Sequence, residues 1–230
     1  MKKIRQKKPK EKSALSQKAY ELIIDRILNK SLFPGQIINR LSIANEIGIS
    51  IAPVLEAMVR LQSEGLLITI PRKGSQIKII KPSEIVGYLI VREAIECQAA
   101  RLYCGEILTK NAPALKKFIY DADHQRKNEV DAWKSEIQLH RALVQLTNCH
   151  SLLNVFEQTM RLGTLCMANV FMEMHQFHPV MSHADLIQQL KSLDPDDAEK
   201  VMSDHLRSGK ANLFEQRIDS WLNVTSGEPR

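Results

Sequence analysis

Residues 41–61 have the sequence LSIANEIGISIAPVLEAMVRL, in which two helical patterns meet at one glycine. The first pattern repeats apolar residues at helical spacing, namely Leu41, Ala44 and Ile47. Gly48 is placed to end that helix, since glycine readily takes the left-handed conformation of a helix C-cap. Ser50 can cap the second helix, and Pro53 is tolerated there because the first turn has N–H groups without helical partners anyway. The stretch predicts two short helices joined by a tight turn, as in a helix-turn-helix.

The flanking sequence completes a small domain. An apolar helical pattern over residues 15–27 ends before the turn signal Phe33–Gly35. After the second helix, residues 66–70 and 75–80 read as two strands around the turn Pro71–Gly74. Three helices followed by a hairpin predict a winged helix-turn-helix domain over residues 14–80.

From Lys81 onward the strand patterns disappear, and the sequence predicts an all-α domain over residues 81–230. The expected helices are 83–106, 112–128, 131–147, 151–174, 180–192 and 195–222. Their breaks fall at Asn111–Pro113, Asn148, His178–Pro179 and Leu193–Pro195. The fold class is therefore mainly α, with a winged helix-turn-helix followed by an antiparallel helix bundle.

Charge is concentrated at the N-terminus. The chain has 230 residues and a formal net charge of +6. Residues 1–13 contain seven Lys or Arg and one Glu, so we expect a basic, disordered tail there. Such a tail suits a polyanion such as DNA, although a leader that only aids solubility would have the same composition.

The composition also bounds the class of protein. No run of apolar residues is long enough to span a bilayer, and the basic N-terminus is not followed by the apolar core of a secretory signal. The four cysteines form no CxxC pair, so we expect reduced thiols. These patterns predict a cytoplasmic protein without a membrane partner.

Several strings in this order resemble the GntR family of bacterial transcription regulators. In the first domain the matching strings are Ile43–Ser50, Pro53–Leu61, Glu64–Leu67 and Pro71–Gly74. The second domain resembles the FCD ligand-binding domain of the FadR-like branch, through Arg92–Glu96, Glu136–His140, Asn148, His183 and His205–Leu206. The resemblance implies a ligand-responsive repressor, not an enzyme, that acts as a homodimer on a near-palindromic operator in double-stranded DNA.

The resemblance also implies a DNA-contact surface. Its candidate residues are Arg40, Ser42, Ser50, Ile51, Ala52, Pro53, Leu55, Arg60, Arg72, Lys73 and Gly74. Leu41, Ile51 and Leu55 stand where this family usually has arginines. Two hypotheses follow. Either these apolar residues contact thymine methyl groups, or the face binds a protein partner and the chain is a sensor or adaptor that does not bind DNA.

Four residues of the second domain form a candidate metal site. Glu136 and His140 lie four apart and so project from one face of one helix, while His183 and His205 come from two later helices. In an antiparallel bundle such residues can converge on one interior point. The resemblance matches these four to the FCD metal ligands, where an aspartate usually replaces Glu136. Three imidazoles and a carboxylate suit zinc, nickel or manganese.

A small carboxylate effector is a further expectation from the resemblance, with Arg92, Arg101 and Asn148 as candidate contacts. The alternative for Arg92 is a salt bridge to Glu96 at i+4. A metal-dependent enzyme is a third functional class with the same ligands, but HExxH, a phosphate-binding glycine loop and an evident general base are all missing from the sequence.

Overall fold

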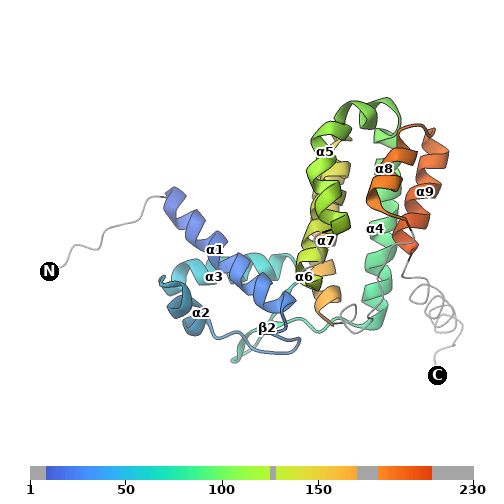
Figure 1. Cartoon of the computed structure of the whole chain (residues 1–230). Coiled ribbons are helices and arrows are strands. Elements are labelled where there is room, and N and C mark those ends of the chain that lie inside the picture. Colours follow the sequence, from blue (N-terminus) through green and yellow to red (C-terminus); the bar gives the residue numbers. More distant parts are fainter. Residues whose placement is uncertain (1–8, 125–127, 170–180, 209–230) are drawn as a thin grey trace, which may run out of the picture. The chain divides into compact units, whose positions relative to one another are not determined.

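The computed structural model describes residues 9–124, 128–169 and 181–208. Within these ranges the chain forms nine α-helices and one two-stranded antiparallel sheet (Figure 1). The prediction of a mainly α fold with a winged helix-turn-helix and a helical domain is confirmed. The contacts separate two compact units with the main boundary between Ile80 and Lys81, and they group Thr164–Asn169 with the first unit.

The first unit contains the three helices and the wing that the sequence predicts. The helices are α1 (Pro9–Leu28), α2 (Arg40–Ile47) and α3 (Ile51–Ser63), and the strands are β1 (Leu67–Ile70) and β2 (Gly74–Ile77). Gly48 ends α2 with a φ of 66°, and its N–H donates to the carbonyls of Ala44 and Asn45. The unit is held together by a core of aliphatic side chains, among them Ala19, Ile23, Ile27, Ile43, Val54, Leu61, Leu66 and Ile77.

Two boundaries of this unit differ from the prediction. Helix α1 is described from Pro9, so residues 9–13 of the segment expected to be a disordered tail are helical. The second strand ends at Ile77 rather than Ile80. Gln76 also pairs with Ile37, an edge contact from the loop before α2 that no sequence pattern indicated. Residues 1–8 of the predicted tail lie outside the described residues.

The second unit is a helical bundle, shown in green to orange in Figure 1. Its helices are α4 (Pro82–Tyr103), α5 (Glu106–His124), α6 (Glu129–Gln145), α7 (His150–Asn169, of which residues 150–163 belong to this unit), α8 (His183–Leu190) and α9 (Pro195–Arg207). Helix α4 packs against α6 and α9, and α5 packs against α6 and α8. These packings bring α4, α6, α8 and α9 around one interior region. None of the helices in the described ranges combines the length and apolarity that crossing a lipid bilayer requires.

One predicted helix break is wrong. We expected a break at Asn111–Pro113, but Pro113 lies inside α5 and the chain breaks at Cys104–Gly105 instead. Gly105 takes a φ of 68°, and its N–H donates to the carbonyl of Leu190 at 2.9 Å. Proline removes only one helical hydrogen bond, and the buried face of α5, including Ala112 and Leu115, continues across it. The expected extensions over residues 170–180 and 209–222 lie outside the described residues.

Candidate functional site

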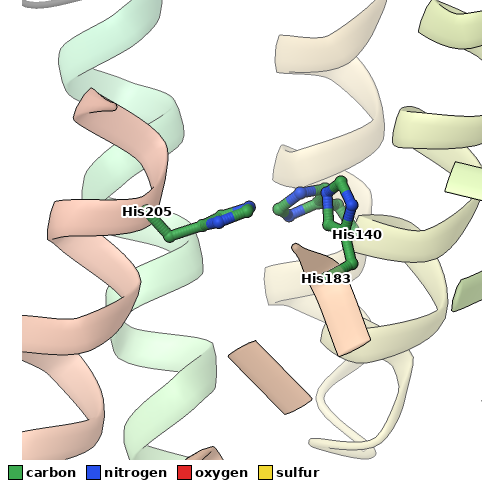
Figure 2. Close-up of side chains that lie close together, drawn as sticks. All are labelled: His140, His183 and His205. Atoms are coloured by element: carbon green, nitrogen blue, oxygen red, sulfur yellow. The ribbon is translucent and has the colours of Figure 1, made fainter. Parts of the chain in front are cut away.

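Three buried histidines meet inside the helical unit. His140 comes from α6, His183 is the first residue of α8, and His205 lies in the last turn of α9. One nitrogen of each ring lies within 4.8 Å of the other two. Figure 2 shows the three rings close together. All three side chains are at least nine-tenths buried. The structure therefore brings together the imidazoles that the spacing predicted would converge.

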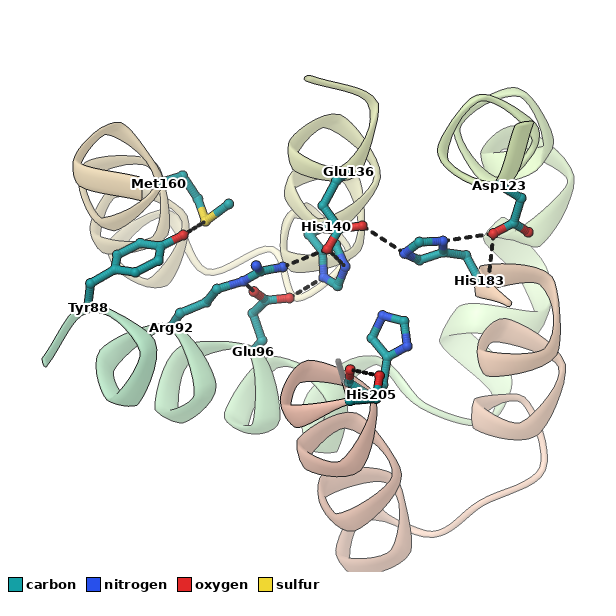
Figure 3. A network of polar contacts seen from close by, with 10 residues as sticks. Tyr88, Arg92, Glu96, Asp123, Glu136, His140, Met160, His183 and His205 are labelled. Carbon is teal, nitrogen blue, oxygen red and sulfur yellow. Dashed lines mark hydrogen bonds and ion pairs between the residues drawn. The ribbon is translucent and has the colours of Figure 1, made fainter. Parts of the chain in front are cut away.

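A glutamate orients the first histidine. The Nδ1 of His140 contacts the carboxylate of Glu96 on α4, so the other ring nitrogen faces the interior of the cluster (Figure 3). This Nε2 is buried and makes no hydrogen bond. It lies 3.3 Å from Oε1 of Glu136, within ion-pair range. A carboxylate behind a histidine is the usual support of a metal-binding imidazole, because it fixes the tautomer and the direction of the ring.

The second histidine has the same arrangement. Asp123, from α5, lies 2.8 Å from Nδ1 of His183 and accepts the backbone N–H groups of His183 and Ala184 at 2.9 and 3.1 Å. It therefore holds both the ring and the first turn of α8. The Nε2 of His183 is buried without a hydrogen bond, 3.0 Å from Oε2 of Glu136. The two inward Nε2 atoms and the Glu136 carboxylate thus face one another (Figure 3).

Arg92 is the cation of this network. Its Nε donates to Oε1 of Glu96 at 2.6 Å and its Nη2 donates to Oε1 of Glu136 at 3.1 Å, with only 2% of the side chain exposed. The i+4 salt bridge to Glu96 is therefore present. Glu96 and Glu136 contact this guanidinium, while Asp123 contacts His183, so the network contains three carboxylates and one guanidinium. This leaves two negative charges in excess before any imidazole is protonated.

The electrostatics of the network follow from this excess. Burial alone would lower the pKa of His140, but Glu96 and Glu136 outweigh it and raise the pKa to about 9. Burial would raise the pKa of Glu96, but His140 and Arg92 lower it to about 2. The pKa of Glu136 is likewise held well below its ordinary value, against the effect of burial, mainly by His140. The cluster therefore favours positive charge at its centre, which a proton on His140 or a divalent cation can supply.

The candidate effector contacts do not assemble around the cluster. Arg101 lies nine residues from Arg92, on the opposite side of α4, where its Nη1 donates to Asp196 at 2.6 Å and to Glu199 at 2.7 Å. Asn148 is exposed and forms the turn between α6 and α7 with a φ of 55°. Of the three candidates, Arg92 alone lies at the cluster.

Sequence reasoning missed two residues of this site. Glu96 was considered only as the partner of Arg92, and its contact with His140 depends on α4 lying against α6. Asp123 lies sixty residues before His183 and carries no motif, so no pattern could indicate that they meet.

Helix α3 has one buried face and one exposed face. Val54, Ala57, Met58 and Leu61 of α3 are buried in the core. On the other side Ile51, Leu55 and Val59 are 38%, 40% and 63% exposed, and Leu41 of α2 is 53% exposed. Pro53 is buried, so it is removed from the candidate DNA contacts, since it lies on the inner side of the helix.

The remaining DNA-contact candidates separate into exposed and internally bonded residues. Ser50 is the N-cap residue of α3, but its hydroxyl makes no capping hydrogen bond. Arg60 is also exposed, but it bonds Glu64 at 3.0 Å and Gln17 at 2.8 Å and lies 4.0 Å above the ring of Tyr20, so it links α3 to α1. The other candidates are exposed, at the start of α2 (Arg40, Ser42), on α3 (Ala52) and at the wing turn (Arg72, Lys73, Gly74).

Comparison with known proteins finds a matching family model for each of the two units. Residues 15–77 match the family model described as bacterial regulatory proteins of the gntR family, and residues 89–208 match the FCD domain. The HTH-type transcriptional repressor RspR of Escherichia coli K12 is 23% identical over 216 residues, covering 91% of this chain and 94% of that protein. The Nta operon transcriptional regulator of Aminobacter aminovorans is 28% identical over 123 residues, covering 52% and 58%.

Solved structures have the same fold. Escherichia coli McbR/YncC superposes with a TM-score of 0.71 at 18% identity, covering 88% of this chain and 98% of that one. A GntR regulator from Rhodococcus sp. RHA1 has a TM-score of 0.67 at 17% identity, with the same coverage.

Proposed function

Because the chain belongs to the GntR family of bacterial regulators and carries an FCD domain, we propose that it is a repressor whose helical domain binds a divalent metal and a small organic acid. The chain is a transcription regulator with a DNA-binding winged helix-turn-helix domain, and not an enzyme. One relative is itself described as a repressor, which supports repression over activation for this chain. The metal, the acid and the homodimer are supported by the features below.

The observation that carries the metal site is the pair of buried, unbonded Nε2 atoms on His140 and His183. A buried ring nitrogen without a hydrogen bond is costly, and a metal ion between the two rings and the Glu136 carboxylate would satisfy both nitrogens. The nearby ring of His205 and the Glu136 carboxylate complete a set of four donors. Two excess negative charges match a divalent cation, and imidazole with carboxylate suits zinc, nickel or manganese.

The organic acid is supported by coordination chemistry. Three imidazoles and one carboxylate leave open positions on an ion that takes five or six ligands, and a carboxylate of the effector can occupy them. Binding of the acid would then favour one geometry of the bundle over another. A change in DNA affinity follows if the two geometries differ in their ability to bind the operator.

A homodimer is supported by an exposed apolar strip on α4. Ile90, Val91 and Leu102 are 50%, 44% and 46% exposed, which is an unusual number of large apolar side chains on one outer helix. Covering this strip with a second copy would give a two-fold assembly. Two winged domains related by two-fold symmetry would require a near-palindromic operator.

The metal site is tested by elemental analysis of protein purified without an affinity tag. We expect about one equivalent of a divalent transition metal per chain in the wild type, and a loss of it in the double variant His183→Ala with His205→Ala. The control is His150→Ala, an exposed residue at the start of α7 that lies outside the cluster. Equal metal content in the double variant and the wild type would refute the site.

Effector binding is tested with the metal-loaded protein on an operator duplex isolated by selection from random sequences. Small hydroxy acids and sugar acids are added singly, and the affinity for the duplex is measured. At least one acid should change the affinity in the wild type and fail to do so in the double histidine variant. An acid that acts equally on both proteins would exclude the cluster as its binding site.

A further inference from the structure

One exposed strip of α3, formed by Ile51, Ala52 and Leu55, is apolar over the first two turns, and the exposed carboxylate of Glu56 lies beside it. Ile51, Ala52 and Leu55 lie within about 100° of one another around the helix axis, and none of them carries a charge or a hydrogen-bonding side chain. Ile51 and Leu55 are 38% and 40% exposed, although burying either would be favourable. A helix-turn-helix uses the N-terminal residues of this helix to contact base edges in the major groove.

The charges of the same unit indicate what covers this apolar side. Arg40 at the start of α2 and Arg72 and Lys73 at the wing turn are exposed cations. Cations at these places suit phosphates, which fix the position of the protein on a duplex without reading sequence. Duplex DNA matches both features. The cations of the protein would contact its phosphate backbone, and the apolar side chains of α3 would contact its bases.

We propose that Ile51 and Leu55 recognise thymine methyl groups, so that each half-site of the operator carries thymine under the first two turns of α3. The inference rests on the operator binding proposed above. The C5-methyl of thymine is the apolar group that the major groove presents at its base-pair edges. A G·C pair at the same place would leave the guanine O6 and N7 and the cytosine amino group desolvated against hydrocarbon, which is unfavourable.

The expected loss of DNA affinity on removing one thymine methyl follows from the apolar area of that methyl group. Burying one such group changes the affinity about fourfold, so replacing a contacted thymine by deoxyuridine should weaken binding about fourfold at each such position. Leu55 is partly exposed in the free protein, so Leu55→Ala should leave the fold intact and remove the effect.

The experiment uses the full chain and a duplex selected from random sequences by the wild-type protein. Each thymine is replaced by deoxyuridine in turn, and the dissociation constant is measured for the wild type, Leu55→Ala and Val59→Ala. We expect one or two thymines per half-site to be sensitive in the wild type, and the thymine that Leu55 contacts to become insensitive with Leu55→Ala. Val59→Ala is the matched control, because it lies a turn further from the helix N-terminus and should keep the sensitivity.

The possible results separate this inference from operator binding itself. If a duplex is selected but no deoxyuridine substitution weakens binding, or if Leu55→Ala keeps the full sensitivity, thymine recognition is refuted while operator binding stands. If no duplex is enriched, both fail. In that case, a larger assembly that Leu55→Lys reduces to smaller species would assign the apolar side to a protein partner.

Discussion

Zinc binding to the histidine cluster should release protons, and the amount should depend on pH in a way that the structure determines. A metal ion and a proton compete for the ring of His140, whose pKa is raised to about 9 by Glu96 and Glu136 against the effect of burial. Binding should therefore release about one proton per zinc ion from this ring at about pH 7.5, and about half a proton at about pH 9.

Protonation of His140 also determines how the apparent affinity for zinc changes with pH. At about pH 7.5 only about 3% of the His140 rings are neutral, and at about pH 8.5 about a quarter are, so zinc should bind about eightfold more tightly at the higher pH. Calorimetry in two buffers with different protonation enthalpies counts the protons released at each pH. Metal-free protein is titrated at a fixed salt concentration.

The variant Glu96→Gln tests whether the Glu96 carboxylate causes the raised pKa of His140. It removes the larger of the two carboxylate effects on His140, so the pKa of that ring should fall and fewer protons should be released at about pH 7.5. Circular dichroism verifies that the variant is folded. Zinc binding to the wild type without proton release at this pH would refute the electrostatic reasoning, and so would equal release from both proteins.

Three further predictions follow from the helical unit. The proton on His140 stabilises the metal-free fold fully below its ordinary pKa of 6.5, so this stability, up to about 3 kcal/mol, should be lost as pH rises through 9 in thermal unfolding. Asp123→Asn should weaken zinc binding about 10–100-fold, because the ring of His183 loses the carboxylate that orients it, as measured by competition with a chelator. Gly163→Ala should lower the free energy of unfolding by about 1–3 kcal/mol, because its Cβ would meet the Tyr88 ring and hydroxyl.

Each of these has an outcome that contradicts it. If the metal-free protein is equally stable below pH 6.5 and above pH 9, the stabilising role of the His140 proton is refuted. Unchanged zinc affinity of Asp123→Asn would show that the carboxylate does not orient the ring. The control for Gly163→Ala is Gly87→Ala, where a Cβ meets nothing within 4 Å and the helix should gain about 0.5–1 kcal/mol. Similar effects of both alanines would contradict the packing argument.

Local patterns predicted most of the fold. Gly48 ends α2, and α9 begins at the predicted break at Leu193–Pro195, because each of these signals acts on its own neighbours. The break between α4 and α5 was misplaced because the decisive event is a long-range hydrogen bond from Gly105 to Leu190, while the proline at position 113 is accommodated within the helix. Long-range packing overrides a local breaker in such cases.

The site was predicted to the extent that helical spacing and resemblance could define it. The convergence of His140, His183 and His205 was predicted. The partners behind the imidazoles were not, because Asp123 and Glu96 reach them across helix contacts that leave no periodic signal. Arg101 was assigned to the effector because its charge is visible in the sequence, whereas its pairing with α9 is not.

The most direct test is a crystal of the zinc-loaded full chain measured at the zinc absorption edge. The account predicts one anomalous peak per chain in the helical unit, about 2.0–2.2 Å from nitrogens of His140, His183 and His205 and from an oxygen of Glu136. A zinc-loaded crystal without a peak among these three rings, or with its peak elsewhere, would contradict it.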